Sequence, residues 1–181
     1  MKIVRWLLMM AIIVPACAIV TAGQEQTSAP APKSPPKIET KFDSGKNETT
    51  VELRALLIRG TETEKILISV TGTFATRTPK KHPEQVIFII SVLSTEYKYP
   101  DVGKLLITSD GKTLAPILLV NFDRRPAEPL CLETLGTRID FDVFMKMAKG
   151  KAVQLQFGET SVELRPDHLE LLSSLADLLH T

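Results

Sequence analysis

The carboxylates Asp140 and Asp142 are the first residues whose types and spacing could do chemistry. On a strand they would share one side, and a pair of carboxylates flanking a sugar bond is the machinery of glycoside hydrolysis. A simpler interpretation is a polar strand face followed by a helix that Asp142 caps. We favour the simpler interpretation and keep a secreted hydrolase with a dispersed active site as the alternative function.

The three histidines, His82, His168 and His180, are the other candidates for chemistry. Two of them fall in the predicted terminal helix, twelve residues apart, which is too far for one helix face to hold a metal ion. The sequence contains no G-x-S-x-G elbow, no P-loop, no G-x-G-x-x-G and no H-E-x-x-H. We therefore assign no catalytic residue, no metal ligand and no cofactor.

A recognition surface is the better-supported hypothesis. Two tyrosines precede the hairpin at Asp110, and Phe122 and two arginines follow it. Hairpin geometry brings these flanks together, and aromatic and Arg side chains are favoured where proteins recognise partners. The alternative is that the tyrosine rings only shield the edge of the core. The candidate binding residues are Tyr97, Tyr99, Phe122, Arg124 and Arg125.

The first 22 residues are typical of an export signal. Lys2 and Arg5 precede an uncharged apolar stretch, Trp6 to Ala22, and small residues close it. Three outcomes stay open: cleavage after Ala22, lipidation of a cysteine, or an uncleaved anchor. About 20 apolar residues are needed to span a bilayer, so the anchor is marginal. The segment predicts export to the periplasm, the extracellular space or the envelope surface.

Cys17 is the candidate for lipidation. Val14-Pro15-Ala16-Cys17 resembles the lipobox of bacterial lipoproteins, in which a small aliphatic residue stands three positions before an acylated cysteine. Pro15 departs from the small residue usual at that position. The competing interpretation of Cys17 is a small apolar residue of the signal. Contact with a membrane is expected only through this N-terminal segment, if it is lipidated or uncleaved.

Residues 23–37 form a proline-spotted linker, and residues 38–181 form one β-rich globular domain. The linker favours extended polyproline geometry and acts as a stiff spacer. Without residues 1–22 the chain has 20 basic and 21 acidic side chains, a net charge of −1. Nucleic-acid binding requires a concentrated basic surface, so the composition argues against it.

Alternation of apolar and polar residues dominates the domain. Val51, Leu53, Ala55 and Leu57 share one face of a first strand, and period-two patterns of this kind are typical of antiparallel sheets. The segment Val86 to Ile90 is continuously apolar, which predicts a central strand covered on both sides.

Two hairpins are expected. Asp110-Gly111 between apolar runs predicts a type I′ turn, and Pro116 marks an edge or a bulge of the returning strand. Gly158-Glu159 predicts a second turn, between strands centred on Leu155 and Val162.

Two helices are expected after the strands. The first is short, Asp142 to Lys149, and ends at Gly150. The second begins at Pro166 or Asp167, where Asp167 and Glu170 have capping-box spacing, and a stripe of leucines follows. The predicted fold is α+β, mainly antiparallel, with sandwich-like sheets, the short helix and the C-terminal helix packed on the sheet.

The layout is similar to that of many secreted and envelope proteins of bacteria, which carry a signal, a Pro-rich spacer and one β-rich domain. The ending, Phe157-Gly158 followed by Val162-Glu-Leu164 and a leucine-striped helix, carries part of that resemblance. The resemblance implies no activity. The predicted function is that of an exported, non-catalytic binding or structural module, whose partner is a protein or an envelope polymer.

Overall fold

The computed structural model describes residues 37–79, 81–99, 103–114 and 116–180. The predicted signal, residue Cys17 and nearly all of the linker lie outside these residues. The strands are β1 (Lys37–Asp43), β2 (Glu48–Gly60), β3 (Glu64–Phe74), β4 (Gln85–Ser94), β5 (Gly103–Ser109), β6 (Lys112–Thr113), β7 (Ile117–Ala127), β8 (Leu130–Asp140), β9 (Val153–Phe157) and β10 (Thr160–Leu164). The helices are α1 (Phe141–Ala148) and α2 (Pro166–Leu179).

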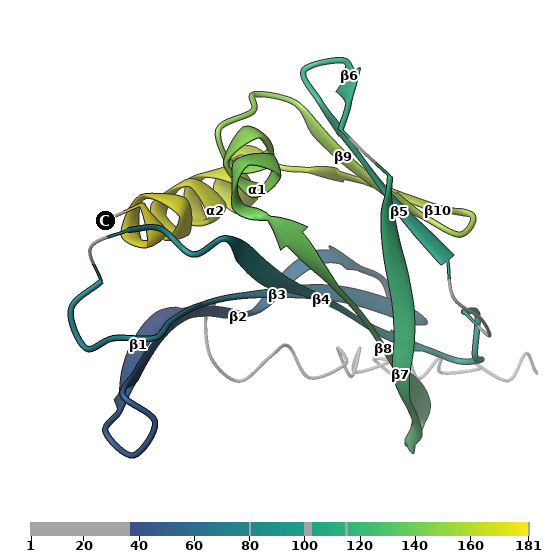
Figure 1. The fold of residues 1–181 in the computed structure, drawn as a ribbon. Coiled ribbons are helices and arrows are strands. Elements are labelled where there is room, and N and C mark those ends of the chain that lie inside the picture. The colour runs from purple at the N-terminus through teal and green to yellow at the C-terminus, as the bar shows by residue number, and fades with distance from the viewer. Residues whose placement is uncertain (1–36, 80, 100–102, 115, 181) are drawn as a thin grey trace, which may run out of the picture.

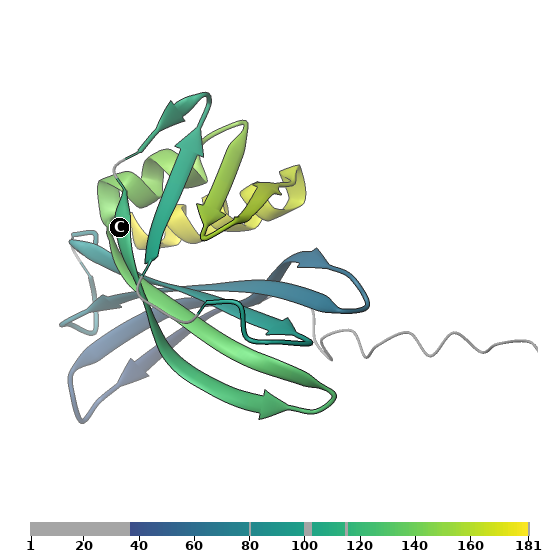
Figure 2. The ribbon, with the colours of Figure 1, turned by 90° about the vertical axis from the view of Figure 1, so that its right-hand side faces the viewer.

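All strand pairs are antiparallel, in the order β1-β2-β3-β4-β8-β7-β5-β9-β10, with β6 beside β5. Strand β7 joins two halves, because residues 117–119 pair with β5 and residues 120–127 pair with β8. We call β1, β2, β3, β4, β8 and β7 the large half, and β5, β6, β9 and β10 the small half. The α+β class is therefore confirmed, as one bent sheet (Figures 1 and 2).

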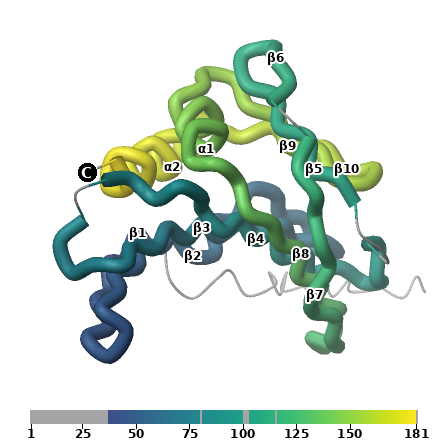
Figure 3. The backbone as a smooth tube through the Cα atoms, in the orientation of Figure 1, coloured from purple at the N-terminus to yellow at the C-terminus, as the bar shows by residue number. Residues whose placement is uncertain are grey.

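Both helices lie on the inner side of the bend, between the two halves (Figures 1 and 3). Helix α2 packs against β2 and against α1. The inner positions of the strands and the apolar stripes of the helices form one continuous core. Its largest fully buried side chains are Phe88, Phe141, Phe144, Phe157, Leu53, Ile66, Ile68, Ile90, Leu105, Ile107, Leu135 and Ile139.

The predicted face of β2 is wrong beyond Leu53. Ala55 has a φ of 51°, and the pairing of β2 with β3 slips between Leu53 and Leu56. This bulge moves the inner positions by one residue, so Leu56 and Ile58 are buried and Ala55 is exposed. The buried residues of β2 therefore have odd numbers up to Leu53 and even numbers from Leu56 onward.

The prediction that residues 86–90 are covered on both sides is also wrong. Val86, Phe88 and Ile90 are completely buried on the inner side of β4. On the opposite side, Ile87 is 43% exposed and Ile89 is half-buried, and no described element covers them. Strand β4 thus has apolar residues on both sides, but the described part of the chain covers only one of them.

The turns and helices follow the predictions closely. Asp110 and Gly111 have φ of 49° and 76°, as a type I′ turn requires. Phe157 pairs with Thr160 across the second turn. The capping-box expectation for Asp167 and Glu170 is wrong, because the backbone N–H of Arg165 instead donates to Nδ1 of His168, at 3.2 Å.

Candidate functional site

The outer faces of the two halves differ in character. On the small half, strands β9 and β10 alternate strictly, with buried apolar residues inside and Gln154, Gln156 and Glu163 exposed outside. That is the ordinary pattern of an antiparallel sheet with one solvated face. The large half departs from it, since several of its outer positions are apolar and open to solvent. This contrast within one protein singles out the outer face of the large half.

Strand register places these outer residues in rows across β3, β4, β8 and β7. The middle row is Ser69, Ile89, Gly136 and Val120. The row on one side is Leu67, Ser91, Thr134 and Asp123, and beyond it lies Lys65, Leu93, Leu132 and Arg125. On the other side Thr71, Ile87 and Arg138 form a row, and Gln85 and Asp140 the next.

The most exposed apolar residues gather around the middle row. Val120 is 40% exposed and Phe122 is 59% exposed, and both lie on the outer side of β7. Leu118, two residues before Val120 on the same side, is 62% exposed. We call Ile87, Leu118, Val120 and Phe122 the apolar band. Exposed apolar residues gathered on one face of a sheet are characteristic of interaction sites.

The side chain of Phe122 is held in place by Gly136. A Cβ atom at position 136 would collide with the Phe122 ring, so the ring lies directly on the glycine of the neighbouring strand. The pairing of β7 with β8 slips between Asn121 and Asp123, which leaves Phe122 as the extra residue of a bulge. Bulge and glycine together fix the aromatic ring on the outer face.

Glu133 organises the opposite side of the same hairpin. Its carboxylate has no exposed surface and accepts from the backbone N–H of Lys98 at 2.6 Å and of Tyr99 at 3.0 Å. The side chains of Asn121 and Arg124 also approach it, at 3.4 Å and 3.2 Å. A buried carboxylate with several donors fixes its surroundings. Glu133 thereby ties the loop before β5 to β7 and β8.

The five predicted binding residues do not form one surface. The guanidinium of Arg124 lies 5.8 Å from the centre of the Tyr97 ring, so these two meet as expected. Phe122 and Arg125 lie on the outer face, where Arg125 is paired with Asp123 at 3.5 Å. The predicted site therefore divides between the outer face and the edge beside Glu133.

Tyr99 belongs to the interior. It is only 9% exposed, its ring lies 5.4 Å from that of Phe157, and its hydroxyl is 2.6 Å from the Thr160 hydroxyl. Burial raises the pKa of its phenol. The alternative interpretation of the tyrosines, that they shield the core, is therefore correct for Tyr99, whereas Tyr97 is exposed.

The residues considered for catalysis make contacts that support the fold. Asp140 precedes α1 and accepts a hydrogen bond from the Gln85 side chain at 2.9 Å, and Asp142 lies exposed in the first turn of α1. His82 and His180 stack around Phe141, whereas His168 is buried at the start of α2. Among the described residues no three His, Cys, Asp or Glu side chains gather as metal ligands would.

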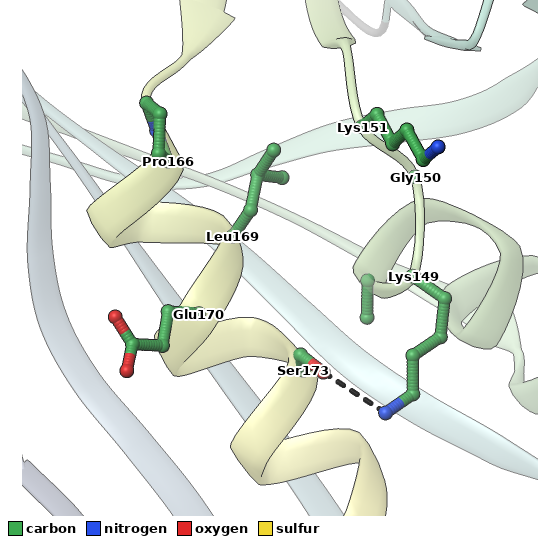
Figure 4. Close-up of a pocket in the computed structure, with 8 residues that line it drawn as sticks. Lys149, Gly150, Lys151, Pro166, Leu169, Glu170 and Ser173 are labelled. Atoms are coloured by element: carbon green, nitrogen blue, oxygen red, sulfur yellow. Dashed lines mark hydrogen bonds between the residues drawn. The ribbon is translucent and has the colours of Figure 1, made fainter.

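A hollow of about 400 Å³ lies between the end of α1 and the start of α2 (Figure 4). Lys149 crosses it and donates to the hydroxyl of Ser173 at 2.9 Å and to the carboxylate of Asp177 at 2.6 Å. These contacts join the two helices. The lysine therefore has an internal partner on α2 and serves helix packing.

Sequence reasoning missed Ile87, Leu118 and Val120. The signal that could have found them was the continuous apolar run of β4, which was interpreted only as burial, and the alternation of Leu118, Val120 and Phe122. What the pattern could not show was that the second cover is missing among the described elements. None of the helices in the described part is long and apolar enough to cross a membrane.

Comparison with known proteins finds no matching protein family, no similar curated protein and no similar solved structure.

Proposed function

We propose that this protein is an exported, non-catalytic module that binds another protein through the outer face of its large half. The observation that carries the proposal is the apolar band. Leu118, Val120 and Phe122 are exposed on β7, and Ile87 is exposed on β4, whose sequence is typical of two-sided burial. Export is supported by Lys2, Arg5 and the apolar stretch that follows them.

A protein partner fits this face better than a lipid or a charged polymer. The charges around the band are of both signs and partly paired, as in Arg54 with Glu52 at 2.6 Å and Arg125 with Asp123 at 3.5 Å. Anionic lipids and polyanions attract an excess of basic side chains. An apolar centre with a mixed polar rim is the anatomy of a protein interface.

The non-catalytic part of the proposal is supported by the positions of the candidate acids and bases. Asp140 receives a hydrogen bond at the start of α1, and His168 receives one at the start of α2. Both residues thus act where helices begin: Asp140 lies at the rim of the outer face, and His168 is buried.

Site-specific photo-crosslinking in the producing cells tests the binding face. A photoreactive residue at position 87 or 122 should give protein adducts, whereas the same residue at position 156 should give none. Gln156 is the matched control because it is exposed on the outer face of the small half. Adducts with glycan or lipid alone, no adducts, or equal adducts at all three positions would overturn the proposal.

Mass spectrometry of the mature N-terminus tests export separately. We expect a chain that begins at Gly23, or at an acylated Cys17, recovered from the envelope or the medium. Recovery of the native chain from the cytosol with Met1 intact would contradict export. The crosslinking experiment would still test the binding face independently.

A further inference from the structure

We infer that the partner on this face is a second copy of the same chain, packed with its large half against the first as a two-fold symmetric sandwich. The inference rests on the proposed function, since it names the protein that the outer face binds. Closed two-fold dimers are the commonest assemblies of soluble proteins, and two packed sheets would give β4 the second cover that its sequence is typical of.

The size of the face matches what a stable dimer requires. Strands β2, β3, β4, β8 and β7 are neighbours, and β4 has 10 residues. With strands spaced at about 4.8 Å and residues at about 3.3 Å, this face measures about 24 Å by 33 Å. That is about 800 Å² per copy, which equals the area each partner buries in a standard-size interface.

The row order makes the face complementary to itself about one axis. The middle row, Ser69–Ile89–Gly136–Val120, has two rows on either side. Val120 lies in it, Phe122 follows on one side, and Ile87 lies in the adjacent row on the other side. The proposed two-fold axis runs along that row and lies in the plane of the interface. It places β8 of one copy on β8 of the other. Each row on one side of the middle row then faces the corresponding row from the other side of the second copy. The aromatic ring of Phe122 then meets the Leu118 end of the other band.

The same axis brings opposite charges together. Asp123 and Arg125 lie on the β7 side of two successive rows, and Arg138 and Asp140 lie on β8 in the two rows beyond the middle. Exchange of the rows places Asp123 beside Arg138 of the second copy, and Arg125 beside Asp140. A two-fold interface repeats each pair twice, so like charges do not face each other and the rim supports the register.

Sedimentation equilibrium of the mature secreted protein over a range of concentrations tests the inference. The wild type should be a dimer. Phe122→Asp should weaken the dimer at least about 10-fold, because a large aromatic side chain that becomes buried against the second copy carries much of an interface's affinity. Leu178→Asp is the matched control: Leu178 is 49% exposed on α2, away from this face, so the control should remain a dimer. The melting temperature of each variant shows that it is folded.

A charge-reversal experiment tests the register. Arg138→Asp alone should weaken the dimer, and adding Asp123→Arg in the same chain should restore it, since both symmetric pairs are then rebuilt with reversed sign. Failure of this rescue would overturn the proposed axis. Unlike Asp123, Arg138 has no ion pair within the described residues, so its substitution leaves the described ion pairs of the monomer unchanged.

The outcomes separate this inference from the proposed function. A wild type that stays monomeric at every concentration, or a Phe122→Asp variant that stays dimeric, overturns the second copy as occupant. If positions 87 and 122 nevertheless crosslink to a different protein, the proposed function stands and only the identity of the partner changes. If the protein is monomeric and gives no protein adduct, the inferred dimer and the proposed binding function are both wrong.

Discussion

Glu133 shows how one residue can determine the shape of a loop. Its buried carboxylate accepts from two backbone N–H groups and two side chains contributed by the loop before β5 and by β7. Lys98, whose backbone is held this way, also reaches Glu64 with its ammonium group at 2.7 Å, and that contact raises the pKa of the lysine. At the residue scale, buried acids position the exposed Tyr97 and Arg124.

We predict that Glu133→Gln lowers the free energy of unfolding by about 2 kcal/mol, because charge-assisted hydrogen bonds to buried groups are lost. The measurement is urea unfolding at neutral pH. Glu163→Gln is the control, since Glu163 is exposed on β10 and its loss should have little effect. Equal effects of the two substitutions would show that the Glu133 network contributes no stability.

We expect His168 to make the stability of the protein depend on pH. The imidazole is buried, and within the described residues its Nε2 atom has no hydrogen-bond partner. Burial, followed by the nearby Arg165 guanidinium, lowers the pKa of His168 from 6.5, and Asp167 opposes this shift. As the pH falls, the unfolded chain therefore takes up the proton before the folded one does.

We predict that the free energy of unfolding is constant above about pH 7 and falls as the pH drops below 6.5 toward the lower pKa of the folded state. Urea unfolding at several pH values between about 5 and about 8 measures this dependence of the free energy on pH. His168→Gln should flatten the dependence, whereas His180→Gln, at the exposed end of α2, should leave it in place. A slope that survives in the His168 variant would assign it to other groups.

At the scale of elements, the bulge in β2 is the clearest departure from regular geometry. Ala55 occupies the left-handed region with a φ of 51°, and its N–H donates to the Ser69 hydroxyl on β3 at 3.0 Å instead of to a backbone carbonyl. The bulge lets β2 change the residues that it presents to α2. The strand thus stays buried along its length at the cost of one strained residue.

We predict that Ala55→Gly raises the free energy of unfolding by about 0.5 to 1 kcal/mol, because glycine adopts this φ without steric cost. Thermal or urea unfolding measures the change. Ala75→Gly is the matched control: Ala75 is exposed and lies outside the positive-φ residues, so glycine there should be neutral or destabilising. A destabilised Ala55→Gly variant would show that the bulge is not strained.

At the scale of the molecule, the bent sheet encloses its helices and leaves two outer faces of different chemistry (Figure 2). The enclosure depends on close approach of α2 to β3. Gly72 lies under Leu179 at the end of α2, and a Cβ atom there would collide with the leucine side chain. The inner side is therefore closely packed, whereas the outer face of the large half carries several exposed apolar side chains.

We predict that Gly72→Ala lowers the free energy of unfolding by about 2 kcal/mol, because overpacking forces the end of α2 to shift. In a Leu179→Ala background the same substitution should cost little, and this non-additivity identifies the contact. Gly103→Ala is the control, since a Cβ there meets nothing within 4 Å. Additive effects at positions 72 and 179 would contradict the contact.

The sequence by itself was sufficient for the α+β class, both hairpin turns and the two helices, because these depend on local periodicity, turn residues and helix boundaries. It also identified Tyr97, Phe122, Arg124 and Arg125 as surface residues near one hairpin, though not which face each would occupy. Tertiary structure decided that Tyr99 is interior, that a bulge changes the buried residues of β2, and that β4 has one covered side. The reason is physical: a strand pattern records that a side chain is apolar, whereas cover depends on elements distant in the chain, or on another molecule.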